Sequence, residues 1–423
     1  MISKRAFLGN LLGGAAVTAA GASFAHTSFA DTPPAVPPAQ PLTSMATGAQ
    51  PISAAERKTR LAKLQGLMRA QGIAAFVVEA GTSLQYFTGV QWGKSERVTA
   101  AVIPAEGDTV IVTPFFEAPS VRETLQIDAL VRTWNEDESP EALIVKVLPG
   151  HKRGGKIAIE PQTRFFIIDK IRKLGSGFTV VSGEGLINAC RQIKSPAELE
   201  LMQIANNITL AALRYVHSNV QAGMTQGDIA RLMDKTTAAL GGPSEFSLVL
   251  LNEASAYPHG SHQPQSVREG STILMDCGCN VHGYQSDMSR SWVFGEPSAK
   301  QRKVWDTVKR GQQVALETAR IGIPTGAIDD AVRAFYTKEG WGPGYQLPGL
   351  SHRTGHGIGL DGHESPYLVH GDASHLQAGM CFSDEPGIYI PGEFGIRLED
   401  CWHMTETGPK LFSELAVSID NPV

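Results

Sequence analysis

The stretch LMDCGCNVHGYQSDMSRSW, residues 274–292, places two aspartates, Asp276 and Asp287, eleven residues apart. Apolar residues and glycine surround both aspartates, and the region around Thr272–Phe294 is typical of a strand hairpin. An unpaired carboxylate in such surroundings is costly unless a metal ion or another partner compensates it. The hairpin therefore predicts a fold that brings buried acids to one site.

A second acidic stretch follows later in the chain. SDEPGIYIPGEFGIRLED, residues 383–400, carries Glu385 and Glu399 within another hairpin-like region, around Met380–Thr405. Two predicted helices separate the two hairpin regions. This order predicts an α+β unit of two similar halves, whose short sheets face a central site and bring all the acids together.

A histidine cluster, HRTGHGIGLDGHESP at residues 352–366, lies between the two acidic regions. Within it, His356 has glycine on both sides, which allows the backbone to approach a site closely. Four carboxylates and one histidine form an oxygen-rich ligand set with a single nitrogen. Such a set suits two divalent cations that share ligands.

Composition narrows the class of protein. The 423 residues suffice for two domains. The hydrophobic fraction of 42% and the charged fraction of 19% are those of an ordinary soluble globular protein. The net charge of −5 provides no basic footprint, so nucleic acid is not an expected partner.

The amino-terminal segment predicts export. Lys4 and Arg5 precede the apolar, Gly/Ala-rich run Ala6–Ala25, and together they predict a signal peptide over residues 1–30. The start of the chain resembles a twin-arginine signal in which lysine replaces the first arginine, and a periplasmic location is expected. An uncleaved membrane anchor ranks second, because the run is short and rich in small residues. Residues 31–51 have the composition of a flexible linker.

The rest of the chain divides into two predicted domains. Strands and helices alternate over residues 52–191, which predicts a small α/β domain, and the hairpins and long helices predict an α+β domain over 192–423. The expected elements of the first domain are the helices Ser53–Gln71, Phe116–Leu125 and Arg164–Leu174, and the strands Ala74–Glu79, Thr99–Ile103, Thr109–Thr113, Lys156–Glu160 and Phe178–Ser182. Those of the second, besides the hairpins, are the helices Pro196–Val216, Thr225–Leu240, Ala299–Ile321 and Ile328–Glu339, and the strand Glu245–Leu251.

Five cysteines occur in the chain, and an odd number leaves at least one thiol unpaired. Cys277 and Cys279 form a C-x-C beside Asp276, but the other half of a thiolate zinc site is missing. Strand alternation also puts both cysteines on the face opposite that aspartate. We therefore expect small buried residues at these positions and not a zinc site.

As a set, these motifs resemble the pita-bread metallopeptidase family M24, over nearly all of the chain beyond the leader. RLAKLQGLMRAQGIAAFVVE at 60–79, followed by YFTG and by Ser95–Arg97, resembles the amino-terminal domain of the creatinase and prolidase branch. The resemblance implies a small creatinase-like α/β domain followed by a pita-bread catalytic domain.

By that resemblance, Asp276, Asp287, His356, Glu385 and Glu399 are the ligands of two metal ions. The family pattern implies that Asp276 binds one ion, that His356 and Glu385 bind the other, and that Asp287 and Glu399 bridge both. Two such ions activate a shared water as hydroxide at neutral pH. The family geometry implies that Glu385 is the proton shuttle. Such a ligand set accepts manganese, cobalt, zinc or iron, and we predict Mn²⁺.

Further residues match positions that contact substrate in the family. His259 resembles the histidine that stabilises the tetrahedral intermediate, and His363 resembles the one near the scissile bond and the carboxyl end. His352 is a looser match, which either lines the pocket or is an ordinary core or surface histidine. Arg397 either holds a substrate carboxylate or orients the last glutamate, and the sequence leaves both roles open. Tyr389 either points into the same cavity or is a buried aromatic residue.

The resemblance implies a peptidase that cleaves the Xaa-Pro bond, acting as an Xaa-Pro dipeptidase (prolidase) or, second, as an Xaa-Pro aminopeptidase on longer peptides. A lyase of the same fold that acts on dimethylsulfoniopropionate and a creatinase-like amidinohydrolase are the alternatives. Creatinase needs no metal, so the intact ligand positions disfavour it. A non-catalytic binding module is the weakest reading, because such modules lose ligands. The family also implies a homodimer.

Overall fold

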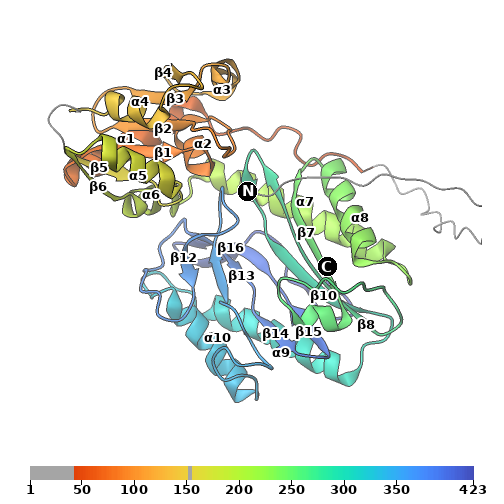
Figure 1. Cartoon of the computed structure of the whole chain (residues 1–423). Helices are drawn as coiled ribbons and strands as arrows, with labels where there is room; N and C mark the ends of the chain where they lie inside the picture. Colours follow the sequence, from red (N-terminus) through yellow and green to blue (C-terminus); the bar gives the residue numbers. More distant parts are fainter. Residues whose placement is uncertain (1–41, 151–154) are drawn as a thin grey trace, which may run out of the picture. The chain divides into compact units, whose positions relative to one another are not determined.

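The computed structural model describes residues 42–150 and 155–423 (Figure 1). The predicted signal peptide and most of the predicted linker lie outside these residues. None of the helices in the described ranges is long and apolar enough to cross a membrane.

A six-stranded sheet organises the amino-terminal half of the described chain. Its strands are β1 (Ile73–Glu79), β2 (Ala100–Pro104), β3 (Thr109–Pro114), β4 (Ala129–Trp134), β5 (Gly155–Ile159) and β6 (Phe178–Ser182). They lie in the order β4-β3-β2-β1-β5-β6, with β1 antiparallel to β2 and parallel to β5. The helices are α1 (Ala54–Ala70), α2 (Thr82–Thr88), α3 (Ala118–Thr124), α4 (Pro140–Val147), α5 (Phe165–Leu174) and α6 (Glu184–Arg191).

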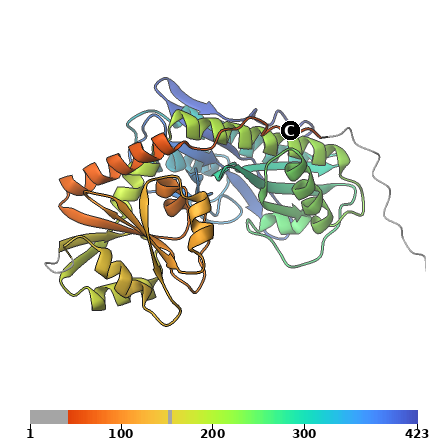
Figure 2. The same cartoon turned by 90° about the horizontal axis from the view of Figure 1, so that it is seen from above.

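Helices cover both faces of this sheet (Figure 2). Because alternate strand residues point to opposite faces, Phe76 of β1 joins the apolar cluster that includes Leu64 of α1. Its neighbour Val77 joins the other cluster, which includes Ile144 of α4 and Ile171 of α5. Both sides of β1 are therefore buried, as its nearly continuous apolar sequence requires.

The second half contains a sheet from each acidic hairpin region. The first has the strands β7 (Ser244–Leu251), β8 (Ser271–Val281), β9 (Tyr284–Gln285) and β10 (Met288–Phe294), with β8 at its centre. The second has the order β12-β11-β13-β16-β17, and its strands are β11 (Gly355–Gly357), β12 (Glu364–Leu368), β13 (Cys381–Asp384), β16 (Asp400–Thr405) and β17 (Gly408–Leu411). The strands β14 (Gly387–Ile390) and β15 (Phe394–Arg397) form a two-stranded ribbon.

Two pairs of helices accompany these sheets. They are α7 (Pro196–Asn219), α8 (Gln226–Ala239), α9 (Ala299–Thr318) and α10 (Gly326–Lys338). Helix α7 starts with a capping box, in which Ser195 and Glu198 each accept a hydrogen bond from the other's backbone N–H, followed by proline in the first turn. The two halves repeat helices and an acid-bearing sheet, as predicted from the order of motifs.

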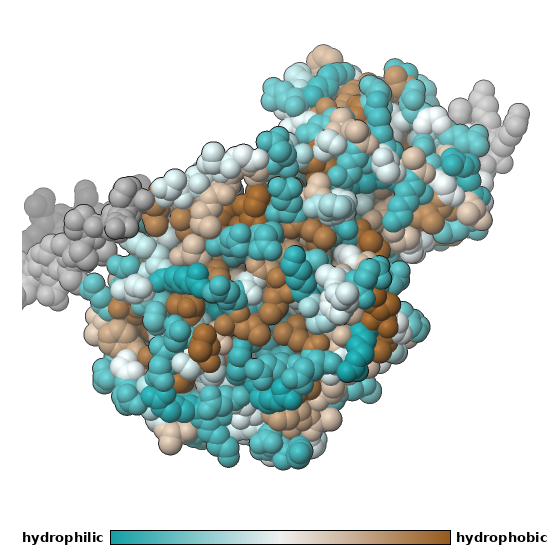
Figure 3. Space-filling view, turned by 180° about the vertical axis from the view of Figure 1, so that it is seen from behind, coloured by the Kyte–Doolittle hydropathy of each residue, from teal (hydrophilic) through white to brown (hydrophobic). Residues whose placement is uncertain are grey.

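Every helix and strand that the sequence predicts is present, within a few residues of the expected bounds. The elements that the sequence reading did not anticipate in the first domain are α2, α4, α6 and β4. Each is short, and β4 is an edge strand whose residues alternate between half-buried and exposed up to the buried Trp134. The surface seen in Figure 3 mixes hydrophilic and hydrophobic residues, as most soluble protein surfaces do.

All five cysteines, Cys190, Cys277, Cys279, Cys381 and Cys401, are buried and free. Sγ of Cys279 lies 3.4 Å from the hydroxyl of Thr209, among the packed side chains between α7 and β8. The C-x-C pair therefore serves as small packing residues, as predicted.

Candidate metal centre

The five residues predicted as metal ligands meet at one cavity of about 470 Å³. Asp276 projects from β8, and Asp287 immediately precedes β10. His356 is the middle residue of β11, whereas Glu385 directly follows β13 and Glu399 directly precedes β16. The two sheets of the second half thus each contribute carboxylates to the same space.

Within that cavity, ligand atoms approach closely enough to share metal ions. Asp276, Asp287 and Glu399 offer oxygens that lie within 4.8 Å of one another, and so do His356, Glu385 and Glu399 with their ligand atoms. Glu399 belongs to both groups, which is the arrangement expected of a carboxylate that bridges two ions. Asp287 also groups with His356 and His363.

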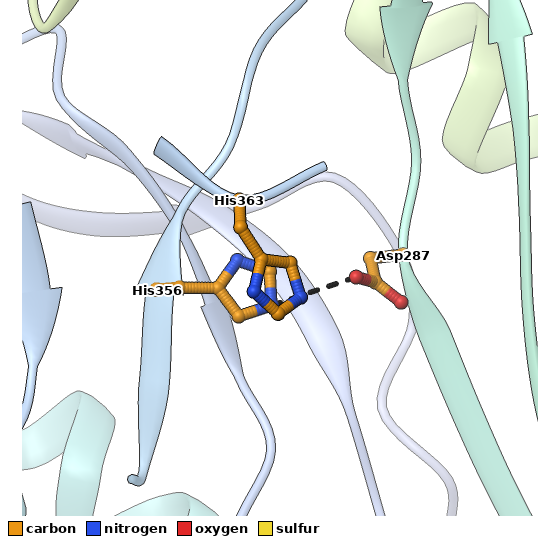
Figure 4. Close-up of side chains that lie close together, drawn as sticks. All are labelled: Asp287, His356 and His363. Carbon is orange, nitrogen blue, oxygen red and sulfur yellow. Dashed lines mark ion pairs between the residues drawn. The ribbon is translucent and has the colours of Figure 1, made fainter. Parts of the chain in front are cut away.

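The imidazole of His356 is oriented for binding through Nε2. Its Nδ1 lies 3.1 Å from the carbonyl oxygen of Gly357, so this nitrogen carries the proton and donates it. Nε2 then keeps its lone pair and lies 3.6 Å from Asp287 Oδ2 (Figure 4). It also lies 3.3 Å from Glu385 Oε1. Burial lowers the pKa of His356 to about 3, which keeps the ring neutral. A fixed neutral imidazole is the form that coordinates a cation.

A buried arginine holds two of the carboxylates in place. Arg397 Nη2 lies 2.5 Å from Asp276 Oδ2, and Nε donates to the hydroxyl of Ser289 at 2.8 Å. That hydroxyl donates in turn to Glu399 Oε2 at 2.7 Å. One guanidinium therefore orients a carboxylate of each acidic hairpin, directly for Asp276 and through Ser289 for Glu399.

The carboxylates of the cavity are short of positive charge. Burial, followed by repulsion from Asp276 and Glu385, raises the pKa of Asp287 well above its ordinary value. Burial and the neighbouring Asp287 likewise raise the pKa of Glu399, and burial raises that of Glu385 to about 8. A group of acids that resists ionisation without cations is what a divalent metal site requires.

These residues fit a pair of divalent metal ions. Oδ1 of Asp276 is buried and has no hydrogen-bond partner among the described residues, although a buried carboxylate oxygen normally has one. A bound cation would satisfy it, and the mixture of several oxygens with one nitrogen suits the first-row divalent ions.

The histidines predicted to contact substrate also line the cavity. His363 stacks on His356, with ring centroids 3.7 Å apart and planes at 22° (Figure 4). His259, next to Pro258, is an exposed residue of the cavity wall. His352 is half-buried, and its Nε2 is 2.6 Å from the hydroxyl of Tyr389. Burial lowers the pKa of His352 to about 3, so its ring is neutral.

Tyr389 is the one predicted substrate-contacting residue that does not line the cavity. Its ring is fully buried, and its hydroxyl lies 3.2 Å from Arg397 Nη1 as well as close to His352. It therefore supports those two side chains from behind the cavity wall, and a substrate-binding role for it stays a prediction.

The structure adds lining residues that the sequence reading did not single out. Arg353 lies between His352 and His356 in the chain and lines the same cavity, and an apolar wall is formed by Phe246, Leu248 and Pro258. The arginine could have been found, because it lies inside the quoted HRTGH motif. The apolar wall gives no comparable signal, since isolated apolar residues in a strand and a loop resemble ordinary core residues.

Comparisons with known proteins agree with this geometry. Residues 200–406 match the model of metallopeptidase family M24, and residues 60–193 match the Creatinase/Prolidase N-terminal domain. The chain is 30% identical over 371 residues to the probable dipeptidase PepE of Mycobacterium tuberculosis, a match that covers 86% of this chain and 94% of that protein. It is also 30% identical over 345 residues to the Xaa-Pro dipeptidase of Lactobacillus helveticus, covering 78% and 90% of the two chains.

Solved structures show the same similarity. The dipeptidase PepE from Mycobacterium ulcerans superposes with a TM-score of 0.77 at 29% identity, covering 86% of this chain and 97% of that chain. The predicted fold class is confirmed: a creatinase-type α/β domain precedes a pita-bread catalytic domain. The chain belongs to metallopeptidase family M24.

Proposed function

We propose that this metallopeptidase is an Xaa-Pro dipeptidase that binds two divalent metal ions. The observation that carries the proposal is the convergence of Asp276, Asp287, His356, Glu385 and Glu399 on one cavity, with Glu399 common to two ligand groups. Relatives that bear the name Xaa-Pro dipeptidase support the choice of substrate.

Two divalent ions held by these residues would supply a water of lowered pKa and a Lewis acid for the scissile carbonyl oxygen. Oε1 of Glu385 faces His356 Nε2 at 3.3 Å, which leaves Oε2 to take the proton of the attacking water. Glu385 then passes that proton to the nitrogen of the leaving proline. This transfer suits proline, because its secondary amine must be protonated to leave.

His259 and His363 complete the proposed site by contacting the substrate. Both line the cavity, and burial lowers the pKa of His363, so that it is a neutral donor or acceptor at neutral pH. The wall of Phe246, Leu248 and Pro258 offers an apolar surface of the kind that an alkyl side chain or a pyrrolidine ring occupies.

The direct test is release of free proline from Ala-Pro by the protein reconstituted with Mn²⁺, run beside Ala-Pro-Ala and beside an Asp276→Ala variant. Cleavage of the dipeptide that requires both Mn²⁺ and Asp276 supports the proposal. Cleavage of the tripeptide alone would make the protein an Xaa-Pro aminopeptidase. If neither peptide is cleaved while two ions are bound, the peptidase assignment is wrong for these substrates, and the lyase alternative is the next to assay.

The remaining features of the proposal come from the sequence and from the family. Mn²⁺ is the proposed native metal, a homodimer is the proposed assembly, and export through the leader at 1–30 is the proposed route to the periplasm. Metal analysis of the purified protein, its mass in solution, and its distribution between cell fractions test these three points separately.

A further inference from the structure

The cavity contains two arginines, and one of them, Arg397, is already bonded to other groups of the protein. Arg397 is 3% exposed. It donates to the hydroxyl of Ser289, contacts the hydroxyl of Tyr389 and the carbonyl of Pro258, and pairs with Asp276. These contacts fit the role of orienting the acids. The other candidate role of Arg397, binding the substrate carboxylate, then falls to a different residue.

Arg353 is the other arginine of the cavity wall, and it is not engaged in this way. Its guanidinium lies over the ring of Tyr367, 4.3 Å from the centroid, and the side chain is half-buried. Within residues 42–150 and 155–423, the Arg353 side chain makes no hydrogen bond and no ion pair. The cavity wall thus presents one cation that is held in position but not neutralised.

The position of Arg353 relative to the metal centre is set by the β11–β12 pair. Tyr367, on which the guanidinium rests, is the cross-strand partner of His356. Arg353 also lines the same cavity as the predicted ligands and His363. The cation therefore lies in the wall of the metal-centre cavity.

We propose that Arg353 binds the terminal carboxylate of the substrate and so selects dipeptides. This inference rests on the proposed function of the site. In an Xaa-Pro dipeptide the carboxylate belongs to the residue directly after the scissile bond, within about one residue length, ~3.8 Å, of the reacting carbonyl. In a longer peptide, the same position is occupied by a neutral amide, which forms no ion pair and no bidentate carboxylate contact with a guanidinium.

A comparison of Ala-Pro with its carboxamide, Ala-Pro-NH₂, isolates this contact. We expect the wild-type protein loaded with Mn²⁺ to prefer the acid over the amide. Arg353→Gln should raise KM for the acid by roughly 10- to 100-fold with kcat nearly unchanged, because a contact remote from the reacting atoms stabilises substrate and transition state alike. Hydrolysis of the amide should not change in the variant, and Arg353→Lys should recover part of the preference.

Product inhibition provides a second readout that does not depend on turnover of the variant substrate. Free proline should inhibit the wild-type enzyme more strongly than prolinamide does, and Arg353→Gln should abolish that difference. Arg268→Gln is the matched control, because Arg268 is an exposed arginine outside the cavity wall. It should leave both preferences intact.

The outcomes distinguish a wrong role for Arg353 from a wrong function for the whole site. If the wild-type enzyme cleaves Ala-Pro but Arg353→Gln loses acid and amide hydrolysis equally, Arg353 is not the carboxylate contact. If the wild-type enzyme cleaves neither compound, the proposed function itself is wrong. Equal melting temperatures of the wild type, Arg353→Gln and Arg353→Lys exclude misfolding as the cause of a loss.

Discussion

Buried acids in the catalytic half of the chain behave in two opposite ways. Glu364, directly after His363, is neutralised by side-chain cations. It forms ion pairs with Arg191 and with Lys194, the latter at 3.1 Å. Arg191 and Lys194 lower the pKa of Glu364 to about 2 although burial opposes them. In the metal centre the pKa of Asp287 is raised instead.

The difference shows what distinguishes a structural acid from a metal-binding acid: whether side-chain cations already neutralise it. Glu364 lies on β12, and its partner Arg191 ends α6 of the amino-terminal domain, so the ion pairs fasten the two halves of the chain next to the site. Among the described residues, Arg397 is the only arginine or lysine within ion-pair distance of the acids of the metal centre. They are short of positive charge, and a metal ion can supply it.

The largest effect is expected at Asp287. Asp287→Asn should lower kcat/KM by about 10³-fold or more, because the site loses a bridging carboxylate and with it a metal ion. The same change removes a repelling charge, so the metal-free protein should become more stable, by about 1–2 kcal/mol at neutral pH. Steady-state kinetics and urea unfolding in the presence of a chelator measure the two effects. A metal-free variant less stable than the wild type would contradict the comparison.

Glu364→Gln should show the reverse pattern of stability. It leaves Arg191 and Lys194 buried without their shared acid, which should cost about 3–5 kcal/mol of unfolding free energy, with or without metal. Urea unfolding measures this loss. Glu393→Gln serves as the control, because its pair with Lys300 is about half exposed, 45% and 51%, and should contribute less than about 1 kcal/mol.

The two acid groups also predict opposite responses to pH. The raised pKa of Glu385, about 8, means that its protonated form stabilises the metal-free fold fully below its unfolded pKa, and that this contribution is lost as pH rises through about 8. Glu364, with a lowered pKa of about 2, contributes fully above its unfolded pKa and loses that contribution as pH falls through about 2.

Thermal unfolding between pH 5 and 9 should therefore show, roughly, a falling stability of the metal-free protein, and a much flatter profile when Mn²⁺ is bound. Calorimetry in buffers of different ionisation enthalpy should detect proton release when Mn²⁺ binds. If the metal-free protein instead gains stability as the pH rises over this range, the acids of the metal centre do not have raised pKa values.

The smallest effect is expected from the hydroxyl that links Arg397 to Glu399. Ser289→Ala should weaken Mn²⁺ binding by about 10- to 100-fold, because the carboxylate loses the partner that orients it. Ser291→Ala is a matched control on the same strand, since the Ser291 hydroxyl donates to the backbone oxygen of Arg397 and bonds to no carboxylate of the described chain. Titration with Mn²⁺ compares them, and equal affinities in both variants would exclude the orienting role.

Much of this organisation could be predicted from the sequence, because its signals are local. Acids within apolar strands and the helix cap formed by Ser195 and Glu198 are both recognised from residues close together in the chain. The sequence did not reveal the pairing of Glu364 with Arg191, since partners 173 residues apart meet only through tertiary packing. For the same reason it left the role of Arg397 open between two alternatives. The helices α2, α4 and α6 were missed because a turn or two of helix carries little periodicity. The strand β4 was missed because it is short and lies at the sheet edge, where few of its residues are buried.

The buried free cysteines can serve as natural probes of the unfolding of this protein. Burial raises the pKa of Cys190 to about 11 and that of Cys381 to about 12, so neither thiol reacts with an alkylating reagent while it stays packed. Cys190 lies in the amino-terminal half and Cys381 in the catalytic half. Pulsed alkylation followed by mass spectrometry can therefore time the unfolding of each half separately, without any engineered label.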